Sequence, residues 1–401
     1  MANRFINPSL ADISQDIAGI IPVDLIKKWE NSKKSAKSHS QLLEPFIKKG
    51  FALSSDSAGL SRLTASKSLL EVLKLVSQPK EIIYSYCKKI GGQAIGVWAA
   101  DNTQVFFPEE IDTEEILKQI AAAQSDIQNL SVQVGMGLHF GEFIDIGGGL
   151  FGEEADFIEE VAENHTSAGE IVLSQKIIDR LPKSYKKLIT EAPDLSIPGI
   201  FRLNLQKFKA RGEKDPDIYY PTPFPQDFYD GIRASDESEA AKVYAKYQQE
   251  KIVILVKIKH TSDKLILNIL TKWTLANTIL KRLTLVDGVT EVKSNGALGI
   301  FVADSVDQAI EFSNDTRDTL KENGYDVTIG LSKGEILLFP MPGGYQEIAG
   351  GPVNIASKLA EDFGEKYSIL IHDSLDLNQV KLKKQEFTTT ISRVELKGVK
   401  I

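Results

Sequence analysis

The stretch Gly350-Gly-Pro-Val-Asn354-Ile-Ala-Ser-Lys358-Leu359 decides how this 401-residue chain is organised. A second copy of its pattern lies 198 positions earlier, as Gly152-Glu-Glu-Ala-Asp156-Phe-Ile-Glu-Glu160. The same spacing pairs Ile171-Val-Leu173 with Ile369-Leu-Ile371, two short apolar runs that are typical of buried strands. Segments of unrelated origin would not keep such a spacing, so the chain contains an internal duplication.

Each repeat has the same order of predicted elements. A strand-rich start (residues 50–55 and 251–258) precedes a long helix, a hairpin, a second helix (113–128 and 305–323), another hairpin, a third helix and a closing strand. This alternation predicts an α+β fold with helices on one face of a sheet. The predicted parts are an N-terminal helical lead-in (1–40), a first domain (41–205), a proline-rich linker (206–245) and a second domain (246–401).

Composition excludes several classes of protein. The net charge of −8 argues against a protein that binds nucleic acid through its phosphates, because such proteins usually carry a basic face. Cys87 is the only cysteine, so an intramolecular disulfide or a thiolate metal cluster is excluded. The chain shows neither a secretory signal nor the roughly 20 apolar residues of a membrane span. We therefore expect a soluble, cytoplasmic protein without a membrane span.

The motifs resemble those of class III adenylate/guanylate cyclases. Gly350–Leu359 is similar to the family pattern Gly-x-x-Val-Asn-x-Ala-Ser-Arg-Leu, and Gly135–Glu142 to its Gly-Ile-His-x-Gly-Glu strand. Ser167–Ser174 resembles Pro-Gly-Glu-Ile-Leu-Val-Ser, and Asp56–Ser61 resembles the metal-binding Asp-Ile-x-Gly-Phe-Thr stretch. The resemblance covers about residues 50–205 and 250–395. It implies two ferredoxin-like domains in one chain that form a head-to-tail pseudo-dimer, with active sites between them.

The family's reaction sets the chemical requirements of those sites. ATP or GTP is converted to a cyclic nucleotide and pyrophosphate, and two Mg²⁺ or Mn²⁺ ions held by aspartates neutralise the triphosphate. An arginine stabilises the charge that develops on the phosphoryl oxygens. An asparagine orients the ribose, and two further residues read the edge of the purine.

The first composite site would take its metal ligands from the first repeat. Asp56 matches the first metal-binding aspartate. The second falls on Ala100, with Asp101 next to it. Adjacent strand residues point to opposite faces, so Asp101 serves as a ligand only if the turn relaxes that rule.

The second repeat would complete this first site. Asn354 matches the asparagine that orients the ribose, and Lys358 stands where the family has arginine, so the charge is kept but the bidentate geometry is lost. Glu291 and Glu347 fall at the purine-reading positions, and two acids suit neither purine. Asp56 and Asn354 have an alternative reading as local helix caps. The resemblance thus implies a damaged site.

The second composite site lacks more of the family's functional residues than the first. Lys257 and Asn295 replace its metal-binding aspartates, and Asp156 and Glu160 replace the asparagine and the arginine. A lysine repels the metal that it should bind, and an acid reverses the charge that the transition state needs. This site is predicted to be unable to cyclise a nucleotide.

Three functions are consistent with these substitutions. The first is a regulatory pseudoenzyme of intracellular signalling that binds a nucleotide, another small ligand or a protein partner. The second is a weak nucleotidyl cyclase that uses the first site with Mg²⁺ or Mn²⁺. The third is a protein-interaction scaffold that binds no nucleotide.

Overall fold

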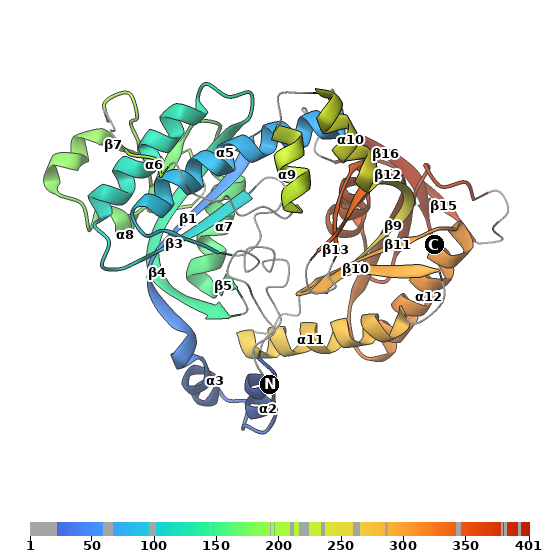
Figure 1. The fold of residues 1–401 in the computed structure, drawn as a ribbon. Coiled ribbons are helices and arrows are strands. Elements are labelled where there is room, and N and C mark those ends of the chain that lie inside the picture. Colours follow the sequence, from blue (N-terminus) through green and yellow to red (C-terminus); the bar gives the residue numbers. More distant parts are fainter. Residues whose placement is uncertain are drawn as a thin grey trace. The chain divides into compact units, whose positions relative to one another are not determined.

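The computed structural model divides the chain into two units. It describes residues 22–58, 67–95, 102–146, 148–192, 194–195, 197–208, 212–215, 224–233, 237–259, 265–284, 288–341, 346–377, 380, 383–391 and 394–401. Unit 1 comprises residues 37–223, and unit 2 comprises residues 19–36 and 224–401 (Figure 1).

Unit 1 is built on one eight-stranded sheet. The strands follow the order β2-β3-β1-β4-β6-β8-β7, and β5 pairs with the end of β4. Only β4 and β6 run parallel; the other pairs are antiparallel. The elements are α3 (Ala36–Leu43), η2 (Glu44–Phe46), β1 (Ile47–Ala58), α5 (Leu69–Lys89), β2 (Gln93–Ala94), β3 (Asn102–Pro108), α6 (Thr113–Ile127), β4 (Gln133–Ile146), β5 (Gly149–Phe151), α7 (Glu153–Asn164), β6 (Ile171–Ser174), α8 (Gln175–Ile178), η3 (Lys183–Leu188), β7 (Ile189–Glu191) and β8 (Ile200–Leu203).

Unit 2 repeats this plan. Its strands follow the equivalent order β10-β11-β9-β12-β14-β16-β15, with β13 on the end of β12. Its elements are α2 (Val23–Glu30), α9 (Gln226–Arg233), α10 (Glu237–Tyr247), β9 (Gln248–Ile258), α11 (Ile266–Leu283), β10 (Val289–Asn295), β11 (Leu298–Ala303), α12 (Val306–Glu322), β12 (Val327–Pro340), β13 (Gln346–Ala349), α13 (Gly351–Lys358), the π-helical turn η4 (Leu359–Phe363), β14 (Ile369–His372), β15 (Gln385–Ile391) and β16 (Val394–Lys400). The α+β class and the duplicated order of elements that the sequence predicts are present in both units.

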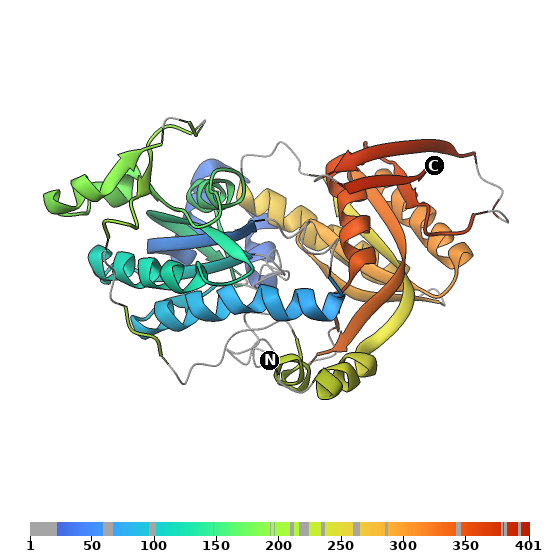
Figure 2. The same cartoon turned by 90° about the horizontal axis from the view of Figure 1, so that it is seen from above.

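Helices cover both faces of each sheet, so the prediction of helices on one face was wrong. In unit 2, the buried residues Ile254, Val256 and Phe301 pack beneath α11 and α12. Val253 and Leu255, which alternate with them along β9, pack instead with Ala356 of α13. Figure 2 shows the paired long helices of unit 1, α5 and α6, side by side along their sheet. This layering places α7 and α13 on equivalent faces of the two sheets.

Local sequence signals set the starts of several helices. Ser68 and Glu71 form a capping box at the start of α5, in which each side chain bonds the other residue's backbone N–H. Asp112 caps α6 and Ser305 caps α12 in a similar way. The equivalent of Ser68 in unit 2 is Leu265, which offers α11 no side-chain cap.

The lead-in and linker segments contain helices that belong to unit 2. The segment predicted as a linker (206–245) includes α9 and most of α10, and Phe228 of α9 packs against Phe339 of β12 with ring centroids 4.7 Å apart. Helix α2, from the predicted lead-in, also lies in unit 2. None of the helices in the described ranges has the length and apolar character that crossing a bilayer requires.

Candidate functional site

The candidate base-reading region of unit 2 contains a buried ion pair. Glu347 on β13 is 5% exposed, and both of its carboxylate oxygens accept from Lys293 Nζ of β10, at 2.9 and 3.1 Å. The backbone N–H of Ile348 donates to Glu347 Oε1 at 3.0 Å. The acid at position 347 is therefore neutralised by a neighbouring strand of its own unit.

Glu291, the other predicted purine-reading residue, does not make this contact. It is half-buried on β10 opposite Phe301 of β11, and the register of the two strands shifts between Glu291 and Lys293. A β-bulge changes the alternation of side chains along a strand. Sequence reasoning missed Lys293 for this reason, although its position two residues after Glu291 was a usable signal.

Asn354 and Lys358 lie on α13, one helical turn apart and therefore on one face. Asn354 is exposed and Lys358 is half-buried. The opposite side of the helix is fixed to the sheet through Ala356, which is fully buried against β12. The structure thus brings the two predicted catalytic residues together on the outer face of a well-anchored helix.

Lys257 of unit 2, at the position of a metal-binding aspartate, has a partner within its own unit. Its Nζ lies 3.2 Å from Glu361 Oε2, and both side chains are 29% exposed. Ser357 donates to the other oxygen of Glu361 at 2.6 Å. A lysine, a carboxylate and a hydroxyl thus join the end of β9 to α13 and η4. The side chain of Asn295 lies outside the described part of the structure.

Asp56 of unit 1 is half-buried near the end of β1. Its backbone lies between Asn102 of β3 and Gly135 of β4. Alternation along the strand places Asp56 on the same face as Ala52, which packs against Ile158 of α7. The other predicted metal ligand, Asp101, lies outside the described residues. Within the described ranges, no three His, Cys, Asp or Glu side chains are grouped as metal ligands would be.

Helix α7 of unit 1 presents acids where the family pattern has an asparagine and an arginine. Asp156 and Glu160 are exposed, and Glu160 accepts from Asn164 at 3.0 Å. The neighbouring Glu159 contacts the Gln104 amide of β3, and burial raises the pKa of its carboxyl to about 7, with further upward effects from Glu163 and Asp156. The acidic side chains on this face of α7 favour protonation over the binding of a negatively charged triphosphate.

His139 of β4 is 3% exposed, as expected for a histidine on a core strand. Its Nε2 contacts Glu154 of α7, which in turn contacts Lys176 of α8. Burial lowers the pKa of the imidazole, and the nearby Glu154 carboxylate opposes that effect. We assign this group to the attachment of α7 rather than to catalysis.

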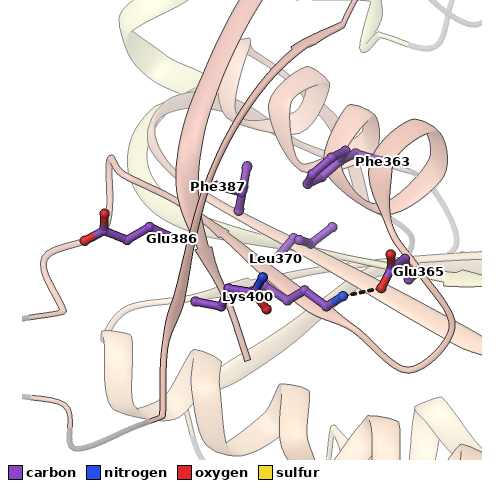
Figure 3. A pocket seen from close by; sticks show the side chains of 7 residues that line it. Phe363, Glu365, Leu370, Glu386, Phe387 and Lys400 are labelled. Carbon is purple, nitrogen blue, oxygen red and sulfur yellow. Dashed lines mark hydrogen bonds and ion pairs between the residues drawn. The ribbon is translucent and has the colours of Figure 1, made fainter.

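A small hollow of about 140 Å³ lies elsewhere in unit 2 (Figure 3). Its apolar part consists of Phe363, Leu370 and Phe387, and the ion pair of Lys400 with Glu365 lies at its side. The predicted site residues are not among its lining residues. Its size suits one apolar side chain, so it gives no support to a nucleotide site.

Comparisons with known proteins gave matches only among solved structures. No family model matches the chain, and no curated protein does. An adenylate/guanylate cyclase/hydrolase from Silicibacter pomeroyi is 15% identical, with a TM-score of 0.32, and the match covers 38% of this chain and 96% of that one. The guanylyl cyclase Cya2 is 14% identical, with a TM-score of 0.34 and coverages of 39% and 91%.

The adenylyl cyclase CyaB from P. aeruginosa is 15% identical, with a TM-score of 0.32 and coverages of 39% and 94%. These matches are to cyclase domains, the family that the motifs resemble, and each spans nearly a whole domain but about two fifths of this chain. At such identities the likeness concerns the fold alone.

Proposed function

We propose that this chain is a catalytically degenerate, tandem cyclase-like protein that binds a nucleotide or a related small ligand as a regulatory module. The observation that supports this most strongly is the Lys257–Glu361 ion pair. A lysine paired with a carboxylate, which itself accepts from a serine hydroxyl, occupies the position where the resemblance implies a metal-binding aspartate. Because Lys257 has a partner within its own unit, the pair favours a role in stability over a role in cyclisation.

The acidic face of unit 1 supports the same conclusion. Cyclisation requires a cation beside the phosphoryl group. At the corresponding position α7 carries Glu160, and the adjacent Glu159 has a carboxyl whose pKa is raised to about 7. Neither side chain supplies the positive charge that this position needs in a cyclase.

The Lys293–Glu347 pair suggests that the ligand would carry a purine base. An ammonium group donates hydrogen bonds and a carboxylate accepts them. Adenine presents an acceptor at N1 beside a donor at its 6-amino group, and guanine presents an acceptor at O6 beside a donor at N1, so the pair can bond the edge of either purine. Inserting a base would exchange the existing ion pair for two hydrogen bonds, which predicts modest rather than tight binding.

A combined thermal-shift and turnover measurement tests this proposal. ATP and GTP would each be added to the full-length protein with and without Mn²⁺, and the samples would be analysed for cyclic nucleotide. We expect ATP, GTP or both to raise the melting temperature without product, since a ligand at 100 times its Kd adds about 2.7 kcal/mol to stability. Lys293→Met should abolish the shift, whereas Lys251→Met, which breaks an exposed ion pair with Asp304 in the same unit, should not.

Two results would contradict the proposal. Formation of cyclic nucleotide at enzyme-like rates would show that the protein is a cyclase rather than a pseudoenzyme. No stabilisation by either nucleotide would favour a scaffold that acts through protein partners.

A weak cyclase activity is the second candidate, and the retained Asp56 and Asn354 favour it. Here Asp56, and Asp101 if its orientation permits, would hold Mg²⁺ or Mn²⁺, Asn354 would orient the ribose, and Lys358 would supply a positive charge. Asp56→Ala should then remove product formation. Asp145→Ala is the matched control, because it breaks the ion pair with Lys48 on the same two strands.

A further inference from the structure

Helix α2, the first helix in the described part of the chain, belongs to unit 2. It precedes the strands of unit 1 in sequence, yet residues 19–36 group with unit 2. Trp29 is 0% exposed and Leu25 is 5% exposed. The indole N–H of Trp29 donates to Asn268 Oδ1 of α11 at 2.9 Å, across 239 positions of sequence. Figure 1 shows α2 beside the start of α11.

The equivalent lead-in helix of the second repeat behaves differently. Helix α9 follows Phe224-Pro225 as α2 follows Ile21-Pro22. It packs on the sheet of the repeat that it precedes, through Phe228 and Phe339. Unit 2 therefore holds both lead-in helices, one on its sheet and one on α11.

Helix α11 has apolar side chains on more than one face, and these must be covered by other parts of unit 2. Leu267 and Leu270 are fully buried, and Ala276 and Leu280 pack in the core beneath it. A helix that is apolar around most of its circumference is stable only when more than one face is covered. The face near Asn268 is the one that α2 occupies.

The second half of α11 is joined to the candidate base-reading region. Asn277 donates from Nδ2 to the carbonyl of Gly296 at 3.3 Å, and Asn277 is 6% exposed. Gly296 lies in the turn between β10 and β11, immediately after the strand that carries Lys293. A single helix thus runs from the Trp29 contact to the hairpin that carries Lys293.

We propose that α2 is a latch on α11 whose attachment controls the position of the β10–β11 hairpin and, through it, the affinity of unit 2 for its ligand. The part that concerns the ligand rests on the function proposed above. Displacement of α2 exposes the apolar face of α11 and loosens the hairpin, so the N-terminal segment becomes a regulatory input to unit 2.

Hydrogen exchange on the full-length protein tests the mechanical part without any nucleotide. Trp29→Ala should speed amide exchange in α11 by about tenfold or more, the effect expected when the burial of one large apolar side chain is lost. The β10–β11 hairpin should respond in the same direction by a smaller factor. Helix α5 of unit 1 should not change, and Lys28→Ala, on the exposed side of α2, should have no effect.

Trp29→Phe is the second variant and keeps the ring while removing the hydrogen bond to Asn268. It should speed exchange only in the first turns of α11. Unchanged exchange in α11, or equal acceleration in α11 and α5, would overturn the latch. Acceleration in α11 without a response of the hairpin would overturn the coupling.

Thermal shifts with ATP and GTP separate this proposal from the preceding one. If wild-type protein is stabilised by either nucleotide, Trp29→Ala should reduce the shift, and an unaltered shift would overturn the regulatory role. If neither nucleotide stabilises the wild-type protein while the exchange pattern appears as expected, the proposed ligand is wrong and the latch stands.

Discussion

Helices α7 and α13 occupy equivalent places in units 1 and 2 but are attached to their sheets by different chemistry. In unit 1, Glu154 and Glu159 of α7 reach His139 of β4 and Gln104 of β3. In unit 2, the backbone of α13 itself lies close to β12, and Lys257 of β9 bonds Glu361 just beyond the helix. The duplicated fold has therefore kept the helix while exchanging the contacts that hold it.

The charges at equivalent positions differ in sign between the units. Asp56 corresponds to Lys257, and Glu160 corresponds to Lys358. These positions lie at a strand end and on an outer helix face, where a charge costs little and packing does not depend on it. The fold tolerates such exchanges of charge between its two copies.

The largest expected difference between the units concerns one glycine on the strand beneath each helix. A Cβ atom on Gly330 of β12 would lie 2.1 Å from the backbone oxygen of Ala356, whereas one on Gly137 of β4 would lie 2.8 Å from the flexible end of Ile158. Backbone cannot move aside as a side-chain methyl does. We expect Gly330→Ala to lower the free energy of unfolding by about 3 kcal/mol and Gly137→Ala by about 1 kcal/mol.

Chemical denaturation with exchange measurements on each unit would check this difference. Gly351→Ala is a suitable control, because nothing lies within 4 Å of the added Cβ atom. Equal losses for the two strand variants would mean that α13 lies no closer to its sheet than α7 does.

The second prediction concerns pH and unit 1 alone. The pKa of Glu159 is raised to about 7, above the value of about 4.3 for an unfolded glutamate. The folded state therefore binds this proton more tightly, and the resulting stability is present below about pH 4.3 and is lost as the pH rises through 7. Glu159→Gln cannot ionise, so it should be more stable than wild type by about 2 kcal/mol above pH 7 and nearly equal at pH 4.

Melting curves of wild type and Glu159→Gln between pH 4 and 8.5 measure the difference in their stability. Glu160→Gln, the exposed neighbour, is the matched control and should not alter the pH profile. A gap that stays constant with pH would show that Glu159 is ionised throughout.

The third prediction tests the Lys257–Glu361 ion pair of unit 2, which lies where the proposed function places a lost metal ligand. Lys257→Met leaves Glu361 without its cation, and the pair is partly exposed, so the free energy of unfolding should fall by about 1 kcal/mol. A double-mutant cycle with Glu361→Gln isolates the pairwise contribution. A coupling energy near zero, or one that does not shrink with added salt, would contradict this account of Lys257.

The sequence predicted the order of elements well because buried strands and amphipathic helices leave periodic apolar patterns, as residues 251–258 and 305–323 do. Lys293 was missed because a bulge is a property of two paired strands. The unit on which α2 packs could not be predicted from the sequence, since the partner of Trp29 lies 239 residues away. Glu159 was overlooked because only packing distinguishes it from the exposed Glu160.

The smallest expected effect compares the starts of the two long helices. Ser68 caps α5, and its hydroxyl accepts from the backbone N–H of Glu71 at 3.3 Å. Leu265 occupies the same place before α11 and supplies no acceptor. Ser68→Ala should therefore lower stability by about 1 kcal/mol, and Leu265→Ser should raise it by about 0.5 kcal/mol, provided that the leucine contributes little apolar burial.

Urea denaturation of the two variants, with exchange at the first turn of each helix, measures both changes. A gain at Leu265 would show that the weak start of α11 is a local defect of the helix itself. A loss would show that the leucine side chain packs beside the region where α2 binds. In that case, the residue before α11 would contribute apolar contact in place of a helix cap, on the helix against which α2 packs.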